Sequence, residues 1–262
     1  MAGALLAACS FVGYADLPAG DGGTHDARPD SPPSLRVEDH VIALWTFDDV
    51  ASATMLADTS GATPSLPLKI ITGATTSAAT IANGRATANA PASRLLGGSN
   101  TRLVPDVIAA NAVTLEAWAQ PASPVEGSAT TPAFVAGLAS NVNTRDIAIT
   151  QAGTQWVARV RTGTPDGKPD LVAVATIDAT TMHPVVVIAD TAVRALYVDG
   201  ELKAMTAPGS LATWEPNVAM TIFDEPQHAR SWLGTVALVA IYDRALTPAE
   251  ITQNFAAGPD AH

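Results

Sequence analysis

The sequence predicts an all-β protein in which two antiparallel sheets pack face to face. Short apolar runs separated by turn residues fill the chain from His40 onward. The 262 residues include 19 glycines and 19 prolines, and no long amphipathic helical pattern interrupts the runs. Because each short strand has to bury one face, a set of about a dozen such strands is expected to fold as a two-layer sandwich.

Local patterns along the chain indicate the individual strands. The segment 112–119 alternates with a period of two, so its Val, Leu and Ala side chains face one side and its Thr, Glu and Trp side chains the other. The segment 184–189 is apolar throughout, which predicts a buried central strand. Asp199 and Gly200 separate two alternating runs and predict a tight hairpin. The expected strands are 41–47, 66–71, 112–119, 134–138, 146–150, 155–161, 171–176, 184–189, 194–198, 201–205, 218–223 and 233–242.

One short helix is expected directly after the last strand. Thr247 is a good N-cap, Pro248 occupies the first helical position, and Glu250 stands three residues after the cap, which together form a capping box. Ile251 and Phe255 are four residues apart and lie on one helical face. We therefore expect a C-terminal helix that docks on the sandwich and ends at the following Gly-Pro pair.

Charge and cysteine content exclude several classes of function. The formal net charge is −11, the pI is about 4.7, and no run of Lys or Arg occurs. Binding to nucleic-acid phosphates or to anionic lipid needs a basic surface, so neither partner is expected. Cys9 is the sole cysteine, so the folded part of the chain has neither a disulfide nor a cysteine metal site.

The first forty residues differ in composition from the rest. Leu6-Ala-Ala-Cys9 resembles the lipobox of bacterial lipoproteins, and the resemblance implies cleavage before Cys9 and lipidation of its thiol. Eight apolar residues cannot cross a hydrocarbon core of about 30 Å, so they predict an anchor rather than a span. The first basic residue is Arg28, so a positive n-region is missing, and a chance small-residue start is the alternative.

The expected organisation has three parts. Residues 1–13 form a lipoprotein-type signal remnant, residues 14–39 an acidic, Pro- and Gly-rich flexible linker, and residues 40–258 the folded domain. This order predicts a protein displayed on a bacterial cell envelope or outside the cell. Its lipid anchor to the membrane would be Cys9.

Five motifs in the folded part resemble laminin-G-like domains of the concanavalin A-like lectin and glucanase class. They are Leu44-Trp-Thr-Phe-Asp-Asp49, Asp58-Thr-Ser-Gly61, Val113-Thr-Leu-Glu-Ala-Trp118, Leu196-Tyr-Val-Asp-Gly200 and the closing strand with its helix. The resemblance covers residues 40–258 and implies a jelly-roll β-sandwich. It also implies recognition of a glycan or a protein partner, because the class contains lectins and adhesion modules as well as some glycosidases.

The resemblance favours a binding module over an enzyme. In β-glucanases of this class the catalytic carboxylates follow the pattern Glu-x-Asp-x-x-Glu on one strand, as paired acid and nucleophile chemistry requires. Here Glu116 stands alone between Leu115 and Ala117, and we interpret it as a structural residue hydrogen-bonded at a sheet edge. A divergent glycoside hydrolase or lyase of the same fold, and a structural envelope protein, are the alternatives.

Calcium is the one cofactor that the resemblance implies. Many relatives carry a calcium ion at the rim, and Asp58, which stands in the Asp-x-Ser-Gly motif, is the candidate ligand, since carboxylates and carbonyls are the ligands that Ca²⁺ prefers. Relatives often carry an acidic pair in the closing strand, where this chain has Ala237 and Leu238. A solvated turn residue is therefore the alternative role for Asp58.

Two groups of residues are candidates for recognition. Trp and charged residues gather in two loops near the C-terminus, where they predict a ligand rim. Two arginines share one face of the strand at 155–161 and are suited to a carboxylate or an acidic sugar. The candidates are Trp214, Asp224, Glu225, His228 and Trp232 in the loops, and Arg159 and Arg161 on the strand. Packing of the Trp rings and solvation of the arginines are the alternative interpretations, whereas Trp45 and Trp118 are expected in the core.

Overall fold

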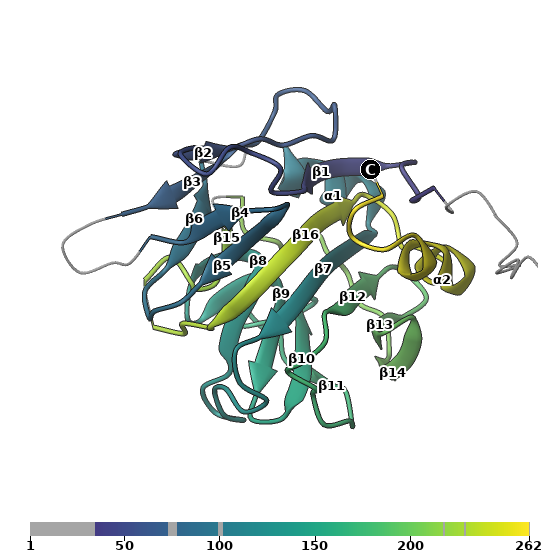
Figure 1. Ribbon diagram of the computed structural model, residues 1–262. Coiled ribbons are helices and arrows are strands. Elements are labelled where there is room, and N and C mark those ends of the chain that lie inside the picture. The colour runs from purple at the N-terminus through teal and green to yellow at the C-terminus, as the bar shows by residue number, and fades with distance from the viewer. Residues whose placement is uncertain (1–34, 73–77, 99–101, 217, 228, 262) are drawn as a thin grey trace, which may run out of the picture. The chain divides into compact units, whose positions relative to one another are not determined.

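A computed structural model describes residues 35–72, 78–98, 102–216, 218–227 and 229–261. These residues form two antiparallel sheets packed face to face, which confirms the expected fold class (Figure 1). Cys9 and most of the expected linker lie outside the described residues, so the predictions made for them stay predictions.

Sheet A contains eight strands among the described residues. Their order is β14-β13-β12-β7-β16-β5-β4, and β1 pairs with the part of β16 that β5 leaves unpaired. The apolar strand expected to be central, β12, lies between β13 and β7 and is buried along its whole length. The bounds are β1 Val41–Trp45, β4 Thr80–Ala82, β5 Arg85–Ala88, β7 Val113–Pro121, β12 His183–Ala189, β13 Arg194–Val198, β14 Glu201–Thr206 and β16 Gly234–Tyr242.

Sheet B, the second layer, also has eight strands in the described part of the chain. Their order is β11-β10-β9-β8-β15-β6-β3-β2, and all neighbours are antiparallel. The bounds are β2 Met55–Leu56, β3 Leu68–Ile71, β6 Arg94–Gly97, β8 Ala133–Asn141, β9 Thr144–Ala152, β10 Gln155–Val160, β11 Leu171–Val172 and β15 Ala219–Ile222.

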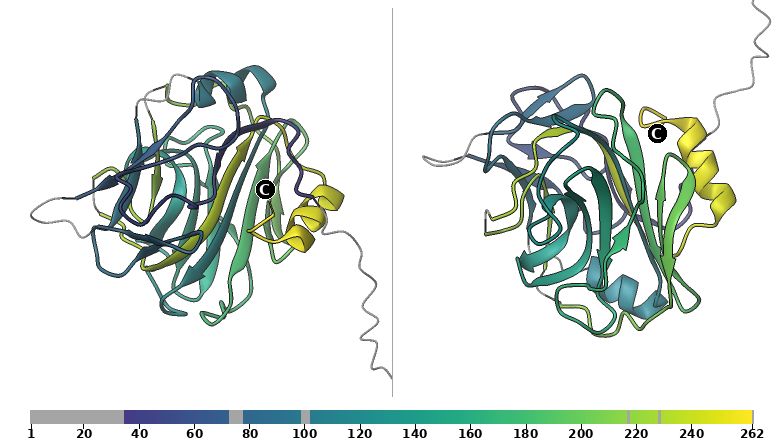
Figure 2. Two further views of the ribbon diagram at one scale, coloured as in Figure 1. Left: turned by 45° about the horizontal axis from the view of Figure 1, so that its top comes forward. Right: turned by 90° about the horizontal axis from the view of Figure 1, so that it is seen from below.

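The main core fills the space between the two sheets. Leu115 and Ala117 of β7 face it, as the alternation predicts, together with Trp45 and Trp156. Trp118 is buried as expected, but on the opposite face of sheet A. There its ring stacks on Phe255, with centroids 6.5 Å apart and an angle of 22° between the planes. A second apolar layer therefore lies between sheet A and the C-terminal helix (Figure 2).

Helix α2, Pro248–Ala257, has the expected capping box. The Thr247 hydroxyl accepts from the Glu250 amide, and the Glu250 carboxylate accepts from the Thr247 amide. Arg244, which donates two hydrogen bonds to that carboxylate, lowers the pKa of Glu250 to about 2. Ile251 is buried against sheet A, as expected from its helical face.

A second helix, α1 at Leu103–Ala110, was not expected. It has eight residues, contains Pro105, and follows Arg102, which provides no side-chain cap, so it lacks the usual N-terminal sequence signal of a helix. Neither helix within the described residues is long and apolar enough to cross a membrane.

The folded domain begins before the expected boundary at His40. Arg36 and Val37 are only 6% and 8% exposed, although the linker was expected to extend to residue 39. A charged residue in a polar stretch gives no local sign of burial. Arg36 is buried because its partner, Glu116, lies on β7 beneath it.

Candidate functional site

The four residues of the predicted loop rim that the structure describes are buried. Trp232, Asp224 and Glu225 have no exposed surface, and Trp214 is 3% exposed. The Trp232 indole donates to Gln151 Oε1 at 2.8 Å, and the Trp214 indole donates to the backbone oxygen of Arg161 at 2.9 Å. These side chains therefore offer no surface to a ligand in this structure, and His228 lies outside the described residues.

Asp224 and Glu225 hold their own loop in place. The Asp224 carboxylate accepts from two backbone amides, and from the Ser231 hydroxyl at 2.7 Å. Glu225 forms a buried ion pair with Arg145 of β9. Burial raises the pKa of Glu225, and the attraction of Arg145 opposes that rise. The pair ties the loop to the outer face of sheet B.

The two strand arginines are also engaged within the molecule. Arg159 donates two hydrogen bonds to Asp170, at 2.7 and 3.1 Å. Arg161 lies 3.7 Å from the Asp146 carboxylate and 3.5 Å from that of Glu215. Burial raises the pKa of Asp146 to about 7, against the opposing effect of the backbone hydrogen bond from Glu215. The structure thus brings Arg161 close to Trp214. The side chains of Arg159 and Arg161 are only 4% and 14% exposed, so both offer little surface to a ligand.

Asp58 is surrounded by donors rather than by further oxygen ligands. Its carboxylate accepts from the amides of Leu44, Ser60 and Leu66 at 3.0–3.1 Å. It also pairs with the Arg102 guanidinium at 3.3 Å. Across the described residues, no group of three or more His, Cys, Asp or Glu side chains could hold a metal. The structure therefore assigns Asp58 to loop closure, with Arg102 as the neighbouring cation.

Glu116 has the structural role that was expected, but not at a sheet edge. It lies on β7, an internal strand of sheet A, and has no exposed surface. Its carboxylate pairs with Arg36 and accepts from the Trp118 indole at 2.8 Å and from the Asn254 amide at 2.9 Å. The Tyr242 hydroxyl lies 3.5 Å away. A carboxylate so enclosed cannot reach a substrate.

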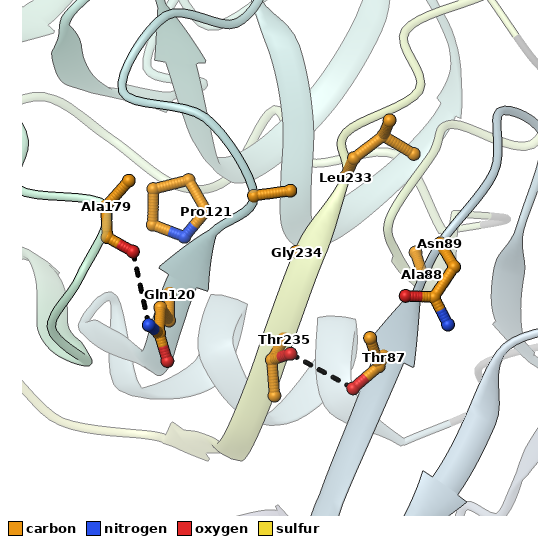
Figure 3. A pocket seen from close by; sticks show the side chains of 10 residues that line it. Thr87, Ala88, Asn89, Gln120, Pro121, Ala179, Leu233, Gly234 and Thr235 are labelled. Carbon is orange, nitrogen blue, oxygen red and sulfur yellow. Dashed lines mark hydrogen bonds between the residues drawn. The ribbon is translucent and has the colours of Figure 1, made fainter.

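An open pocket of about 380 Å³ lies elsewhere on sheet A, at one end of β5, β7 and β16 (Figure 3). It is on the outer face, because Thr87, Gln120 and Thr235 alternate with core residues along their strands. These three side chains lie in one row, since Thr235 pairs with Thr87 on one side and with Gln120 on the other. The lining residues are Thr87, Ala88, Asn89, Gln120, Pro121, Ala122, Ala179, Leu233, Gly234 and Thr235.

Internal hydrogen bonds hold the polar groups of this pocket. The hydroxyls of Thr87 and Thr235 are 3.0 Å apart, and one donates to the other. The Gln120 side-chain amide donates to the backbone oxygen of Ala179 at 3.1 Å, which ties the rim to β7 (Figure 3). Asn89 lies exposed at the end of β5. Every polar side chain among the lining residues is a hydroxyl or an amide, and none of them carries a charge.

The floor of the pocket is Gly234. A Cβ at this position would lie 2.5 Å from the Trp232 ring and 2.5 Å from the Gln120 backbone oxygen. Trp232 packs directly beneath, against Phe223 at 6.1 Å and Trp156 at 6.5 Å between ring centroids. The predicted rim residue Trp232 therefore supports the pocket from below.

Sequence reasoning missed this pocket for a physical reason. Thr87, Gln120 and Thr235 come from segments far apart in the sequence, and only the strand register aligns them. Single uncharged residues in strands also form no recognisable sequence motif. The Gly at the start of the closing strand was visible in the sequence, but it did not indicate which strands would lie beside it.

Comparison with known proteins identifies the family. The model of the concanavalin A-like lectin/glucanases superfamily matches residues 96–252, which is more than half of the chain. The protein belongs to this superfamily. A search of curated protein sequences finds no match. This assignment confirms the resemblance noted in the sequence. It does not by itself define a function, because one fold can serve proteins of very different function.

Solved structures share the concanavalin A-like fold at low identity. The binding domain of botulinum neurotoxin DC in complex with rat synaptotagmin II has a TM-score of 0.61 and 12% identity, over 84% of this chain and 52% of that one. A Trypanosoma rangeli sialidase has a TM-score of 0.62 and 14% identity, over 87% of this chain and 35% of that one. A structure of botulinum neurotoxin type C, whose cell entry is described as dependent on two ganglioside molecules, has a TM-score of 0.58 and 11% identity, over 83% of this chain and 51% of that one. The chain thus spans about half or a third of the length of these proteins.

Proposed function

We propose that this protein is a non-catalytic binding module that recognises a glycan or a protein partner, and that the pocket over β5, β7 and β16 is its binding site. The observation that carries the proposal is an open pocket lined by uncharged hydroxyl and amide groups on a rigid sheet. Concave sites with a few fixed polar groups are typical of small-ligand recognition, and volumes of about 300–1,000 Å³ are usual.

The lining residues of the pocket do not supply what hydrolysis of a glycosidic bond requires. That reaction uses a pair of carboxyl groups on either side of the bond. None of the ten lining residues is ionisable. The similarity to sialidases is a similarity of fold at 14% identity or less, so it does not favour the enzyme alternative over the binding one.

The proposal includes display on the outside of the cell. The lipobox-like Leu6-Ala-Ala-Cys9 and the Pro- and Gly-rich segment after it support an anchor and a tether. Domains of the same fold in the neurotoxin structures are described as receptor-binding, synaptotagmin-binding or ganglioside-dependent. A surface ligand of glycan or protein nature fits this placement.

A glycan array probed with the full chain, in calcium and again in chelator, tests the proposal. Selective binding that is weakened in Thr235→Val but unchanged in Thr206→Val would support it, because Thr206 is on β14, away from the pocket lining. If the array is blank, the parent protein, Thr235→Val and Thr206→Val are used to capture partners from an envelope extract. The proposal is overturned if neither assay finds a ligand that Thr235→Val binds less well than Thr206→Val.

A further inference from the structure

We infer that the pocket over β5, β7 and β16 takes an uncharged saccharide rather than an acidic sugar or a peptide. The inference rests on the proposed function and names the ligand class of the same site. The fold neighbours include sialidases bound to acidic sugars and a ganglioside-dependent toxin, so the charge of the ligand is the informative question.

The charges around the pocket oppose an acidic ligand. No Lys, Arg or His is among the residues that line it. The chain has a net charge of −11, so an anion approaches a protein of like charge. A carboxylate that enters the pocket would lose water without gaining a cationic partner, which is unfavourable. A neutral sugar meets neither obstacle.

The arginines that could grip an acidic sugar are committed elsewhere. Arg145 is paired with Glu225, and Arg159 with Asp170, on the outer face of sheet B. Two loops lie against this face. In one of them a Cβ at Gly167 would lie 2.9 Å from the Arg159 Cβ, and in the other the Glu215 amide donates to the Asp146 carboxylate. An acidic ligand would have to displace these loops and break buried ion pairs, which is strongly unfavourable.

The polar groups of the pocket match sugar hydroxyls. The Thr87–Thr235 pair uses one hydroxyl proton for its mutual bond, so the second proton and the remaining lone pairs can meet a ligand. Gln120 donates to Ala179 through its nitrogen, which leaves its carbonyl oxygen as an acceptor. The exposed Asn89 amide offers both donors and an acceptor at the rim. Vicinal sugar hydroxyls act as donor and acceptor at once, and this mixed set suits them.

Apolar surface lies next to these polar groups. Pro121 and Leu233 line the pocket on the side away from Thr87 (Figure 3), and Ala122 is a further apolar lining residue. The C–H face of a sugar ring can lie against such a surface while its hydroxyls reach the polar row. A protein partner would instead be expected to use exposed aromatic or Arg anchors, and the lining residues include neither.

The polar row is organised before any ligand arrives. Each Thr hydroxyl is fixed by the other, and Gln120 is fixed by the rim. All three residues belong to hydrogen-bonded strands, so a ligand orders few side chains on binding. Loss of one hydroxyl should therefore be felt directly in affinity.

The test uses the full chain, with matched neutral and acidic glycans, by array and then by calorimetry. We expect neutral glycans to bind, with affinity lowered about 5- to 10-fold in Thr235→Val and in Thr87→Val, as for a lost hydrogen bond of about 1 kcal/mol. Thr206→Val should bind like the parent. Because no charge is involved, affinity should change by less than about 2-fold between 0.05 and 0.5 M NaCl.

Four outcomes would overturn the inference. Selective binding of acidic glycans would show that the charge argument is wrong. Binding of neutral glycans by both Thr variants with the affinity of the parent protein would place the site elsewhere. A blank array together with a protein partner lost in Thr235→Val would reject the saccharide but leave the binding module intact. Absence of any ligand in both assays would reject the proposed function as well.

Discussion

Arg36 and Glu116 form an ion pair buried beneath the C-terminal helix, with a nitrogen–oxygen distance of 2.5 Å and side chains that are 2% and 1% exposed. Arg36 also donates to the Gly258 backbone oxygen, and the Val37 amide donates to Asn254 of α2. Glu116 thus connects three parts of the domain: the segment before β1, strand β7 and helix α2. The segment before β1 is therefore fastened to an internal strand of sheet A.

Removing the charge of Glu116 is expected to destabilise the domain strongly. In Glu116→Gln the Arg36 guanidinium stays buried without a counter-ion, which typically costs about 3–5 kcal/mol. Chemical denaturation measures the loss. Glu201→Gln is the control, because its pair with Lys203 is exposed and such pairs contribute about 0–1 kcal/mol.

A double variant separates the ion pair from general packing. Arg36→Met combined with Glu116→Gln removes both charges, so it should lose less stability than the sum of the two single variants. Additive losses would contradict the view that the two charges compensate each other.

Sequence patterns predicted the sandwich because strand alternation and turn residues are local properties. The Asp199-Gly200 hairpin and the Thr247 cap followed from single turns, and both lie where they were expected. Partners across the sheets are not local. Trp232 was a candidate for a ligand rim because it stands in a loop, with packing of its ring as the alternative, and its indole in fact reaches Gln151 in the interior. The pocket needed the register of three strands, which no single segment contains.

Arg102 is expected to replace calcium as the cation next to Asp58. Its guanidinium donates to the backbone oxygens of Ile42 and Pro64 as well as to the Asp58 carboxylate. The parent protein should therefore have the same Tm in calcium and in chelator. Arg102→Met should lose about 3–5 kcal/mol, because Asp58 is then buried without its partner. A chelator-dependent Tm of the parent protein would contradict this role.

His183 should make stability depend on pH. Its ring nitrogen lies 2.9 Å from the Asp199 carboxylate, and this hydrogen bond raises the pKa of His183 against the opposing effect of burial. A raised folded-state pKa means that the contribution is complete below pH ~6.5 and is lost as the pH rises through the folded-state value. Tm measured from pH 5 to 9 should fall over that range.

Asp199→Asn isolates this effect from other titrating groups. Burial raises the pKa of Glu126 to about 7, as it does for Asp146, so both also favour the folded state at lower pH. Asn keeps the turn, because it tolerates the positive φ of 55° at this position. The Tm difference between parent and variant should be largest near pH 5–6 and small near pH 9. A difference that is constant with pH would exclude His183 as its source.

Gly200 and Phe255 are expected to be coupled. Gly200 has a φ of 77°, and a Cβ there would lie 3.0 Å from the Phe255 ring, which itself stacks on Trp118. Gly200→Ala should therefore cost about 1–3 kcal/mol through backbone strain and contact with the ring. Phe255→Ala should cost about 1–2 kcal/mol, because the ring is 43% exposed and its loss is only a partial loss of burial. In the double variant the contact with the ring disappears and only the strain remains, so denaturation should give a total smaller than the sum. If the double variant instead loses as much stability as the two single variants together, the Phe255 ring moves aside without cost. The contact between this ring and the hairpin then does not hold α2 in place.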